Sequence, residues 1–133
     1  MKKIFIGYDP RQIISYTVLS ASIIRHASEP VSISPLVIDT LPVTRQGLTP
    51  FTYSRFLVPF LCDYVGEAVF LDADILLRGD ICRLFDFLDG NDIAVRQSHL
   101  KFEWASVMVF DNARCRELTP ELGDRDWETA SPT

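Results

Sequence analysis

The sequence predicts an α/β fold in which helices flank a mostly parallel, Rossmann-like sheet. Three observations predict it. Short runs rich in isoleucine, valine and leucine alternate with segments of helical period, in the order β-α-β-α-β-α-β-β. The run at 68–71 is wholly apolar, as expected for a central strand buried on both faces. The chain has 133 residues, 47% of them hydrophobic, which suits one domain with one core.

The first strand and helix are marked by a change of period. Lys3–Gly7 reads KIFIG, an apolar run closed by glycine, and predicts a buried strand. Asp9 and Pro10 form an N-cap and first-turn pair, so we expect a helix over residues 11–26. The apolar residues that recur along one face of this helix are Ile14, Val18, Ala21 and Ile24.

Proline shapes the next two elements. Residues 31–38 alternate apolar and small polar side chains like a strand, which Pro35 restricts to an edge or bulged position. After a loop at 41–50, Thr49 and Pro50 repeat the capping signal, and Pro59 should kink or shorten the helix that follows. The apolar residues at helical spacing in that helix are Tyr53, Phe56, Leu57, Phe60 and Leu61.

The second half supplies three further strands. The strand at 68–71 ends in Asp72-Ala73-Asp74, and apolar character resumes at 75–77. We expect a short capped helix from Gly79-Asp80 to Leu88, a turn at 89–91, and strands at 93–95 and 105–110. Periodicity fades after residue 116. We therefore place the domain at 1–116 and expect 117–133 to be a weakly structured tail.

The Asp-x-Asp triplet at 72–74 is informative only through its context. Twelve aspartates give about one such triplet by chance, and two are present. The other, Asp124 with Asp126, lies in the polar tail. Asp72 and Asp74 instead follow a buried strand, at the end where open α/β sheets bind ligands. The alternative is a turn cap beside a solvated carboxylate.

Asp72 and Asp74 are suited to a divalent cation. Residues two apart on an extended chain face one side, with Cα atoms roughly 6.5 Å apart, so both carboxylates can reach one ion. Oxygen ligands suit Mg²⁺ or Mn²⁺, whose remaining positions substrate phosphates can fill. The pair thus predicts a metal that neutralises charge on a diphosphate.

Composition excludes several other classes. A net charge of -5 argues against a nucleic-acid partner, and no apolar run is long enough for a membrane span or signal peptide. The cysteines are odd in number and widely spaced, so neither disulfides nor a zinc site are expected. We therefore expect a cytoplasmic location with reduced thiols. The cysteines are Cys62, Cys82 and Cys115.

Four segments together resemble a known group. FIGYD (5–9), FTYSRFLVP (51–59), VFLDADILL (69–77) and WASVMVFDN (104–112) follow the order and approximate spacing seen in GT-A glycosyltransferases. The likeness is closest to the retaining family that includes glycogenin and lipopolysaccharide galactosyltransferases. It implies transfer of a sugar from a nucleotide-diphosphate donor, such as a UDP-sugar, to an acceptor that the sequence does not identify.

The resemblance also implies site residues. Asp72 and Asp74 match the metal-binding DXD motif, with Ala73 between them beside the donor. The residues expected to line the base and ribose pocket are Gly7, Tyr8 and Asp9. Arg55 matches the arginine of the family's tyrosine-x-arginine helix and would reach the donor sugar or diphosphate; the alternative is an arginine on an exposed helix face.

Other matches concern the acceptor and the metal. Trp104 and Ser106 match the acceptor region, although burial in a strand is the alternative for both. Family members run beyond this length, and their later portion supplies a histidine metal ligand that His99 does not match. A shortened sheet would gain from pairing with a second copy, so a homo-oligomer is possible.

Two other functions stay open from the sequence. The chain could be a nucleotide-sugar-binding or interaction module that lacks turnover. A phosphatase of the haloacid dehalogenase type also carries Asp-x-Asp after a strand, with the first aspartate as nucleophile. Against the phosphatase, Ile75-Leu76-Leu77 replaces the expected small or hydroxyl residue, and only Lys101 is available downstream to balance a phosphate.

Overall fold

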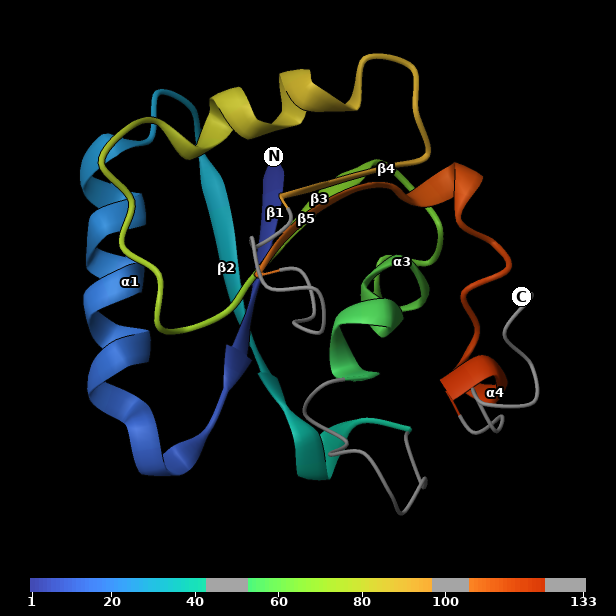
Figure 1. The fold of residues 1–133 in the computed structure, drawn as a ribbon, viewed down its shortest axis with the longest axis horizontal. Coiled ribbons are helices and arrows are strands. Elements are labelled where there is room, and N and C mark those ends of the chain that lie inside the picture. Colours follow the sequence, from blue (N-terminus) through green and yellow to red (C-terminus); the bar gives the residue numbers. More distant parts are fainter. Residues whose placement is uncertain (43–52, 97–105, 124–133) are drawn as a thin grey trace.

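The computed structural model describes residues 1–42, 53–96 and 106–123. They form a five-stranded sheet with α1 on one side and α3 and α4 on the other (Figure 1). The strands are β1 (Lys2–Tyr8), β2 (Val31–Val37), β3 (Glu67–Leu71), β4 (Ile93–Arg96) and β5 (Val107–Asp111). The α-helices are α1 (Ile13–His26), α3 (Val58–Leu61) and α4 (Pro120–Gly123). The 3-10 helices are η1 (Pro10–Gln12), η2 (Ile38–Thr40), η3 (Arg55–Leu57), η4 (Ile81–Leu88) and η5 (Asn112–Arg114).

The strand order is β2-β1-β3-β5-β4. β1 pairs in parallel with both β2 and β3, whereas β5 is antiparallel to β3 and to β4. Four strands therefore run one way and only β5 is reversed, which confirms the predicted α/β class with a mostly parallel sheet. β3 is central and β2 is an edge strand, as the apolar run at 68–71 and Pro35 predicted.

Helix α1 meets the sheet through a different face from the one that the sequence picked out. The predicted apolar face is exposed: Ile14 is 77%, Val18 51% and Ile24 67% accessible. Leu19 and Ile23 are buried instead. The helix carries apolar residues on both sides, and periodicity alone does not say which side the crossover from β1 turns toward the sheet.

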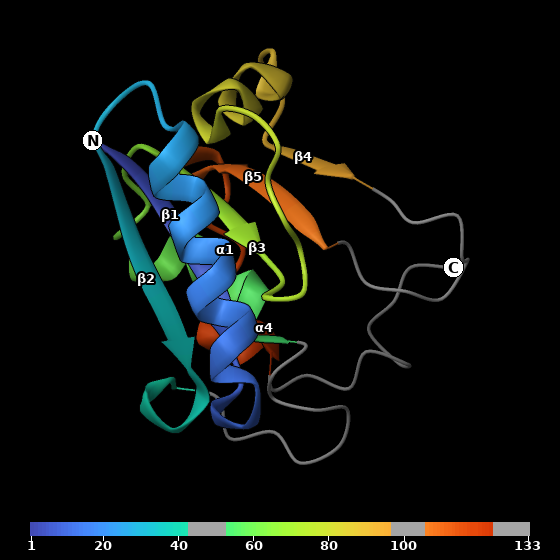
Figure 2. The same cartoon turned by 90° about the vertical axis from the view of Figure 1, so that its left-hand side faces the viewer.

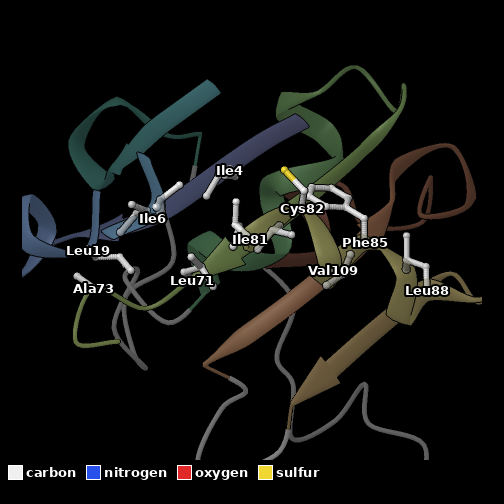
Figure 3. Close-up of a cluster of buried hydrophobic side chains, with 12 residues drawn as sticks. Ile4, Ile6, Leu19, Leu71, Ala73, Ile81, Cys82, Phe85, Leu88 and Val109 are labelled. Atoms are coloured by element: carbon white, nitrogen blue, oxygen red, sulfur yellow. The ribbon is translucent and has the colours of Figure 1, made fainter. Parts of the chain in front are cut away.

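Two hydrophobic clusters lie on opposite faces of the sheet. On the α1 face, Leu19 and Ile23 pack with residues from β1, β3, β5 and η4, and Figure 3 shows Ile4, Ile6 and Leu71 among them. The other cluster joins α3 to the reverse side of the strands through the buried residues Phe5, Leu36, Val58, Cys62, Ala68, Phe70, Met108, Phe110 and Cys115. Alternate residues of β3 thus serve the two clusters, which is why its sequence is continuously apolar.

The segment around Pro59 is broken into short pieces, as predicted. The 3-10 helix η3 passes directly into α3, where Pro59 occupies the first turn. Tyr53 and Leu57 are buried, but Phe60 and Leu61 are more than one-third exposed, so only part of the predicted apolar face enters the core.

The predicted helix after Asp80 is present as η4, and the expected turn follows it. Asp89 (φ 41°) and Gly90 (φ 81°) adopt the left-handed conformation that such a turn requires. Beyond the proposed boundary at residue 116, Leu118 packs on the cluster around α3, and its carbonyl accepts a hydrogen bond from the Tyr64 hydroxyl (3.0 Å). The expected loop at 41–50 lies largely outside the described residues, as does most of the expected tail.

Candidate functional site

The carboxyl ends of β1, β2 and β3 meet at one edge of the sheet. In register, Tyr8 of β1 lies opposite Val37 of β2, and Ile6 lies opposite Leu71 of β3. Since adjacent strands lie about 4.8 Å apart, the residues that follow these positions are close neighbours. The FIGYD segment and the aspartate triplet are therefore brought to the same place, as Figure 2 allows the reader to follow from the ends of β1 and β3.

A pocket of about 320 Å³ lies at the ends of β1 and β2. Tyr8 and Asp9 line it, as expected, and Gly7 lies buried in the strand just before them. The Tyr8 ring is half-buried and packs edge-on against Tyr16, with centroids 5.4 Å apart. The full lining is Tyr8, Asp9, Pro10, Arg11, Val37, Ile38 and Asp39.

Asp9 is held by Arg11 rather than left open. Its Oδ1 accepts hydrogen bonds from the Arg11 backbone N–H (2.9 Å) and Nε (3.1 Å), and its Oδ2 accepts one from Nη2 (2.9 Å). The side-chain bond to Arg11 is the main reason that the pKa of Asp9 lies below its usual value. Asp9 therefore begins the first helical segment, as predicted, and presents a cationic side chain at the pocket.

Asp72 lies at the end of β3 and is tied to the start of β5. Its backbone N–H donates to the Ser106 carbonyl (3.0 Å), and its carbonyl accepts from the Ile75 N–H (3.4 Å). The chain therefore turns at 72–75 instead of continuing extended, which corrects the geometry assumed from the sequence. Ala73 is buried on the α1 face, Asp72 is half-buried and Asp74 is exposed.

Burial raises the pKa of the Asp72 carboxyl. Arg55 opposes this rise, the negative charge of Asp74 adds to it, and a hydrogen bond with the Ser106 side chain lowers it again. The effect of Asp74 on Asp72 shows that the two carboxylates feel each other's charge across the turn. A site with two such groups favours a cation.

Arg55 is the largest surprise of the site. The sequence left open an exposed helix arginine, but Arg55 is only 3% accessible. Its Nη2 donates to Asp72 Oδ1 at 3.2 Å, and its guanidinium carbon lies 4.8 Å from the Phe70 ring centroid. Burial lowers the pKa of Arg55, and the Asp72 charge opposes that change. Arg55 therefore contacts the acid pair, as a site residue should.

The two carboxylates are the only cation ligands that this part of the chain brings together. Among the described residues, no group of three or more His, Cys, Asp or Glu side chains could hold a metal ion. Asp72 and Asp74 offer hard oxygen atoms at the sheet edge, which fits a magnesium or manganese ion that takes its other ligands from a diphosphate. His99, Lys101 and Trp104 lie outside the described residues.

Some residues of this edge were missed by sequence reasoning. Val37, Ile38 and Asp39 line the pocket because β2 ends beside β1, a neighbour relation that only the sheet order reveals. Ser106 was matched to the acceptor region, yet here it contacts Asp72. An antiparallel neighbour at the end of β3 would have indicated that contact.

Comparison with known proteins places this geometry in a family. The sequence model of Glycosyl transferase family 8 matches residues 4–117, which contain every candidate site residue named above. The chain belongs to this family. A family 8 domain is expected to carry out sugar transfer and not phosphate hydrolysis, so the phosphatase interpretation receives no support.

A curated relative and two solved structures agree with the family 8 assignment. Protein CDI of Arabidopsis thaliana is 32% identical over 90% of this chain and 57% of its own length. The bifunctional glycosyltransferase WbbM in its apo form shares the fold with a TM-score of 0.70 at 19% identity, over 86% of this chain and 32% of that one. The galactosyltransferase LgtC, in complex with donor and acceptor sugar analogues, gives 0.61 at 15% identity, over 92% and 62%. The chain thus spans less than two thirds of each.

In the described residues of this family 8 chain, no helix is long and apolar enough to cross a membrane. The three cysteines are free and buried. Burial raises the pKa of the Cys115 thiol to about 11, which leaves it unreactive as a nucleophile near neutral pH. None of the cysteines therefore competes with the acid pair as the chemical centre.

Proposed function

We propose that this family 8 domain transfers a sugar from a nucleotide-diphosphate donor, a UDP-sugar, to an acceptor. One observation carries the proposal: the pocket at the ends of β1 and β2 and the acid pair at the end of β3 lie next to each other on one sheet edge. A nucleoside diphosphate needs an enclosing pocket for its base and ribose and a neutralising site for its phosphates. Open α/β sheets bind such ligands at this edge.

The pocket is assigned to the nucleoside. Its volume lies near the lower end of the ~300–1,000 Å³ that small-ligand sites occupy. Tyr8 offers an aromatic ring against which a base can pack, while Asp39 offers a carboxylate that could accept hydrogen bonds from ribose hydroxyls. Gly7 has no side chain to block the approach of a ligand to the strand end, so the family-derived assignment of 7–9 is retained.

Asp72 and Asp74 are assigned to the metal. Their carboxylates would hold Mn²⁺ or Mg²⁺, which supplies positive charge against a departing diphosphate. Ala73 packs into the core and anchors the turn between them. Because the Asp72 backbone is bonded to Ser106, the carboxylate is held at the edge instead of following the loop.

Binding of donor without turnover is the second candidate function. The chain spans 57% of Protein CDI and 62% of LgtC, and two carboxylates are the only cation ligands gathered in the part of the chain that the structure describes. A binding module would retain metal-dependent UDP affinity and release no sugar from a UDP-sugar. Donor hydrolysis, or transfer to added acceptors, separates the two functions.

Calorimetric titration with UDP, with and without Mn²⁺, tests the proposal. We expect Mn²⁺ to strengthen UDP binding and Asp74→Ala to abolish most of that gain, because one of two carboxylate ligands is lost. Asp86→Ala is the matched control, since Asp86 is an exposed aspartate on η4, away from the acid pair. Equal UDP affinity with and without Mn²⁺ in the folded protein would rule out the metal-dependent site.

A cytoplasmic setting is also proposed. The buried cysteines are unpaired, which supports a reducing compartment. Labelling of the protein in fractionated cells would test this assignment independently of activity.

A further inference from the structure

The guanidinium of Arg55 is buried beside the candidate metal ligands instead of lining the open pocket. Its side chain is 4% accessible, whereas that of Asp72 is 20% accessible. A group so enclosed offers little surface to a ligand that arrives from solvent. The Asp72 carboxylate beside it is the more accessible member of the pair.

Both partners of Arg55 come from β3. Phe70 and Asp72 are two residues apart on that strand, so their side chains lie on the same face of the sheet. The Arg55 guanidinium carbon lies 4.8 Å from the Phe70 ring centroid, and Nη2 lies 3.2 Å from Asp72 Oδ1. The aromatic ring and the carboxylate therefore act together on one planar cation, which limits its freedom.

Burying an arginine is costly unless the group is paired and bonded. Here the cost is met by an interaction with only one oxygen of Asp72, so the carboxylate is oriented without being used up. In metal sites, hydrogen bonds to the ligands fix their orientation, and their loss weakens metal binding by about 10–100-fold.

We propose that Arg55 is a positioning residue that acts through Asp72, holding Oδ1 so that the carboxylate faces the cation. This rests on the proposed function, because it assumes that Asp72 is a metal ligand. It differs from the role implied by the family resemblance, in which Arg55 reaches the donor directly. Phe70 completes the device by fixing the guanidinium from below.

The test measures Mn²⁺ binding by electron paramagnetic resonance, without nucleotide, in Arg55→Gln and Arg55→Lys. We expect about a tenfold or greater loss of Mn²⁺ affinity in Arg55→Gln and a smaller loss in Arg55→Lys, which keeps the charge but not the planar fork. Arg83→Gln is the matched control, since Arg83 is exposed on η4 and should leave Mn²⁺ affinity unchanged.

Two results would overturn the inference. Unchanged Mn²⁺ affinity together with weaker metal-free UDP binding would place Arg55 on the donor. Tighter Mn²⁺ binding in Arg55→Gln would make Arg55 a competing cation. Failure of wild type to bind Mn²⁺ would instead remove the proposed function itself, so the two failures are distinguishable.

A second variant guards against loss of fold. Arg55→Gln leaves a half-buried carboxylate without its cation, so circular dichroism must first establish that the variant is folded. If it is not, Phe70→Leu keeps the core apolar and removes only the ring beneath the guanidinium. We expect Phe70→Leu to weaken Mn²⁺ binding in the same direction by a smaller factor, and no change would contradict the role of Phe70.

Discussion

Asn112 is a fully buried polar residue that joins two distant parts of the chain. Its Nδ2 donates to the Val65 carbonyl (3.0 Å), and its backbone N–H donates to the Gly66 carbonyl (2.9 Å). Both acceptors lie in the turn that leads into β3, where Gly66 has a positive φ of 72°. Asn112 therefore secures the strand that carries the acid pair from the end opposite to the site.

Asn112→Ala should destabilise the fold by about 2 kcal/mol, because it removes a buried hydrogen bond and leaves the Val65 carbonyl without that partner. Urea unfolding followed by circular dichroism measures the change. Asn91→Ala is the control: its Nδ2 makes a similar bond to the Leu88 carbonyl (2.9 Å), but the residue is exposed. Equal losses in the two variants would show that burial of Asn112 contributes nothing.

Among the elements, η4 shows how a single cap links two segments. Asp80 Oδ1 accepts hydrogen bonds from the Cys82 N–H (3.0 Å), inside η4, and from the Ser28 N–H (3.1 Å), after α1. Hydrogen bonds, first with Ser28 and then with Cys82, lower the pKa of Asp80 to about 2. The sequence predicted the cap, but the bond to residue 28 is visible only in the fold.

The low pKa of Asp80 predicts a pH dependence of stability. Its folded pKa of about 2 lies below the model value of 3.8, so ionised Asp80 stabilises the fold above pH 3.8 and loses this contribution as the pH falls toward about 2. Asp80→Ala should therefore lower the melting temperature at pH 6 by more than at pH 2.5. Thermal scans across this range provide the measurement.

Asp80→Asn is the control for that experiment. Asparagine is also a good N-cap, so it should retain most of the helix capping while removing the charge. The difference between wild type and Asp80→Asn should shrink as the pH falls. A difference that stays constant from pH 6 to pH 2.5 would contradict the assigned titration.

At the scale of the whole molecule, apolar surface is left uncovered on the α1 side of the sheet. The outer side of α1 exposes Ile13, Ile14, Val18 and Ile24. A groove of about 820 Å³ also runs between residues 75–78, η4, β4 and β5. Contiguous apolar surface of this kind favours association, in line with the homo-oligomer suggested by the sequence.

Replacing Ile14 and Ile24 by glutamate tests that association. Since both side chains are exposed, the double variant should keep its circular dichroism spectrum, while any self-association seen by light scattering should fall as charge is placed on the apolar face. Thr17→Glu, an exposed polar position on α1, is the control. A wild-type protein that stays monomeric at high concentration would refute the homo-oligomer.

Local chemistry in the sequence was enough to predict the α/β class, the edge position of β2, the break at Pro59 and the Asp80 cap. Each depends on a residue's own backbone or on its near neighbours, as with the missing N–H of proline. The acid pair was also found, because the end of a buried strand marks where ligands bind in open sheets.

Only the tertiary structure decided which face of α1 meets the sheet, that residues 37–39 share the pocket with Tyr8, and that Arg55 is buried on Phe70 and Asp72. These outcomes depend on strand order and on contacts between segments far apart in the chain. A helix with apolar residues on both sides, or an arginine at a helical position, has the same local pattern whichever neighbour the fold supplies. Long-range packing therefore determines the partner, and the partner determines the role.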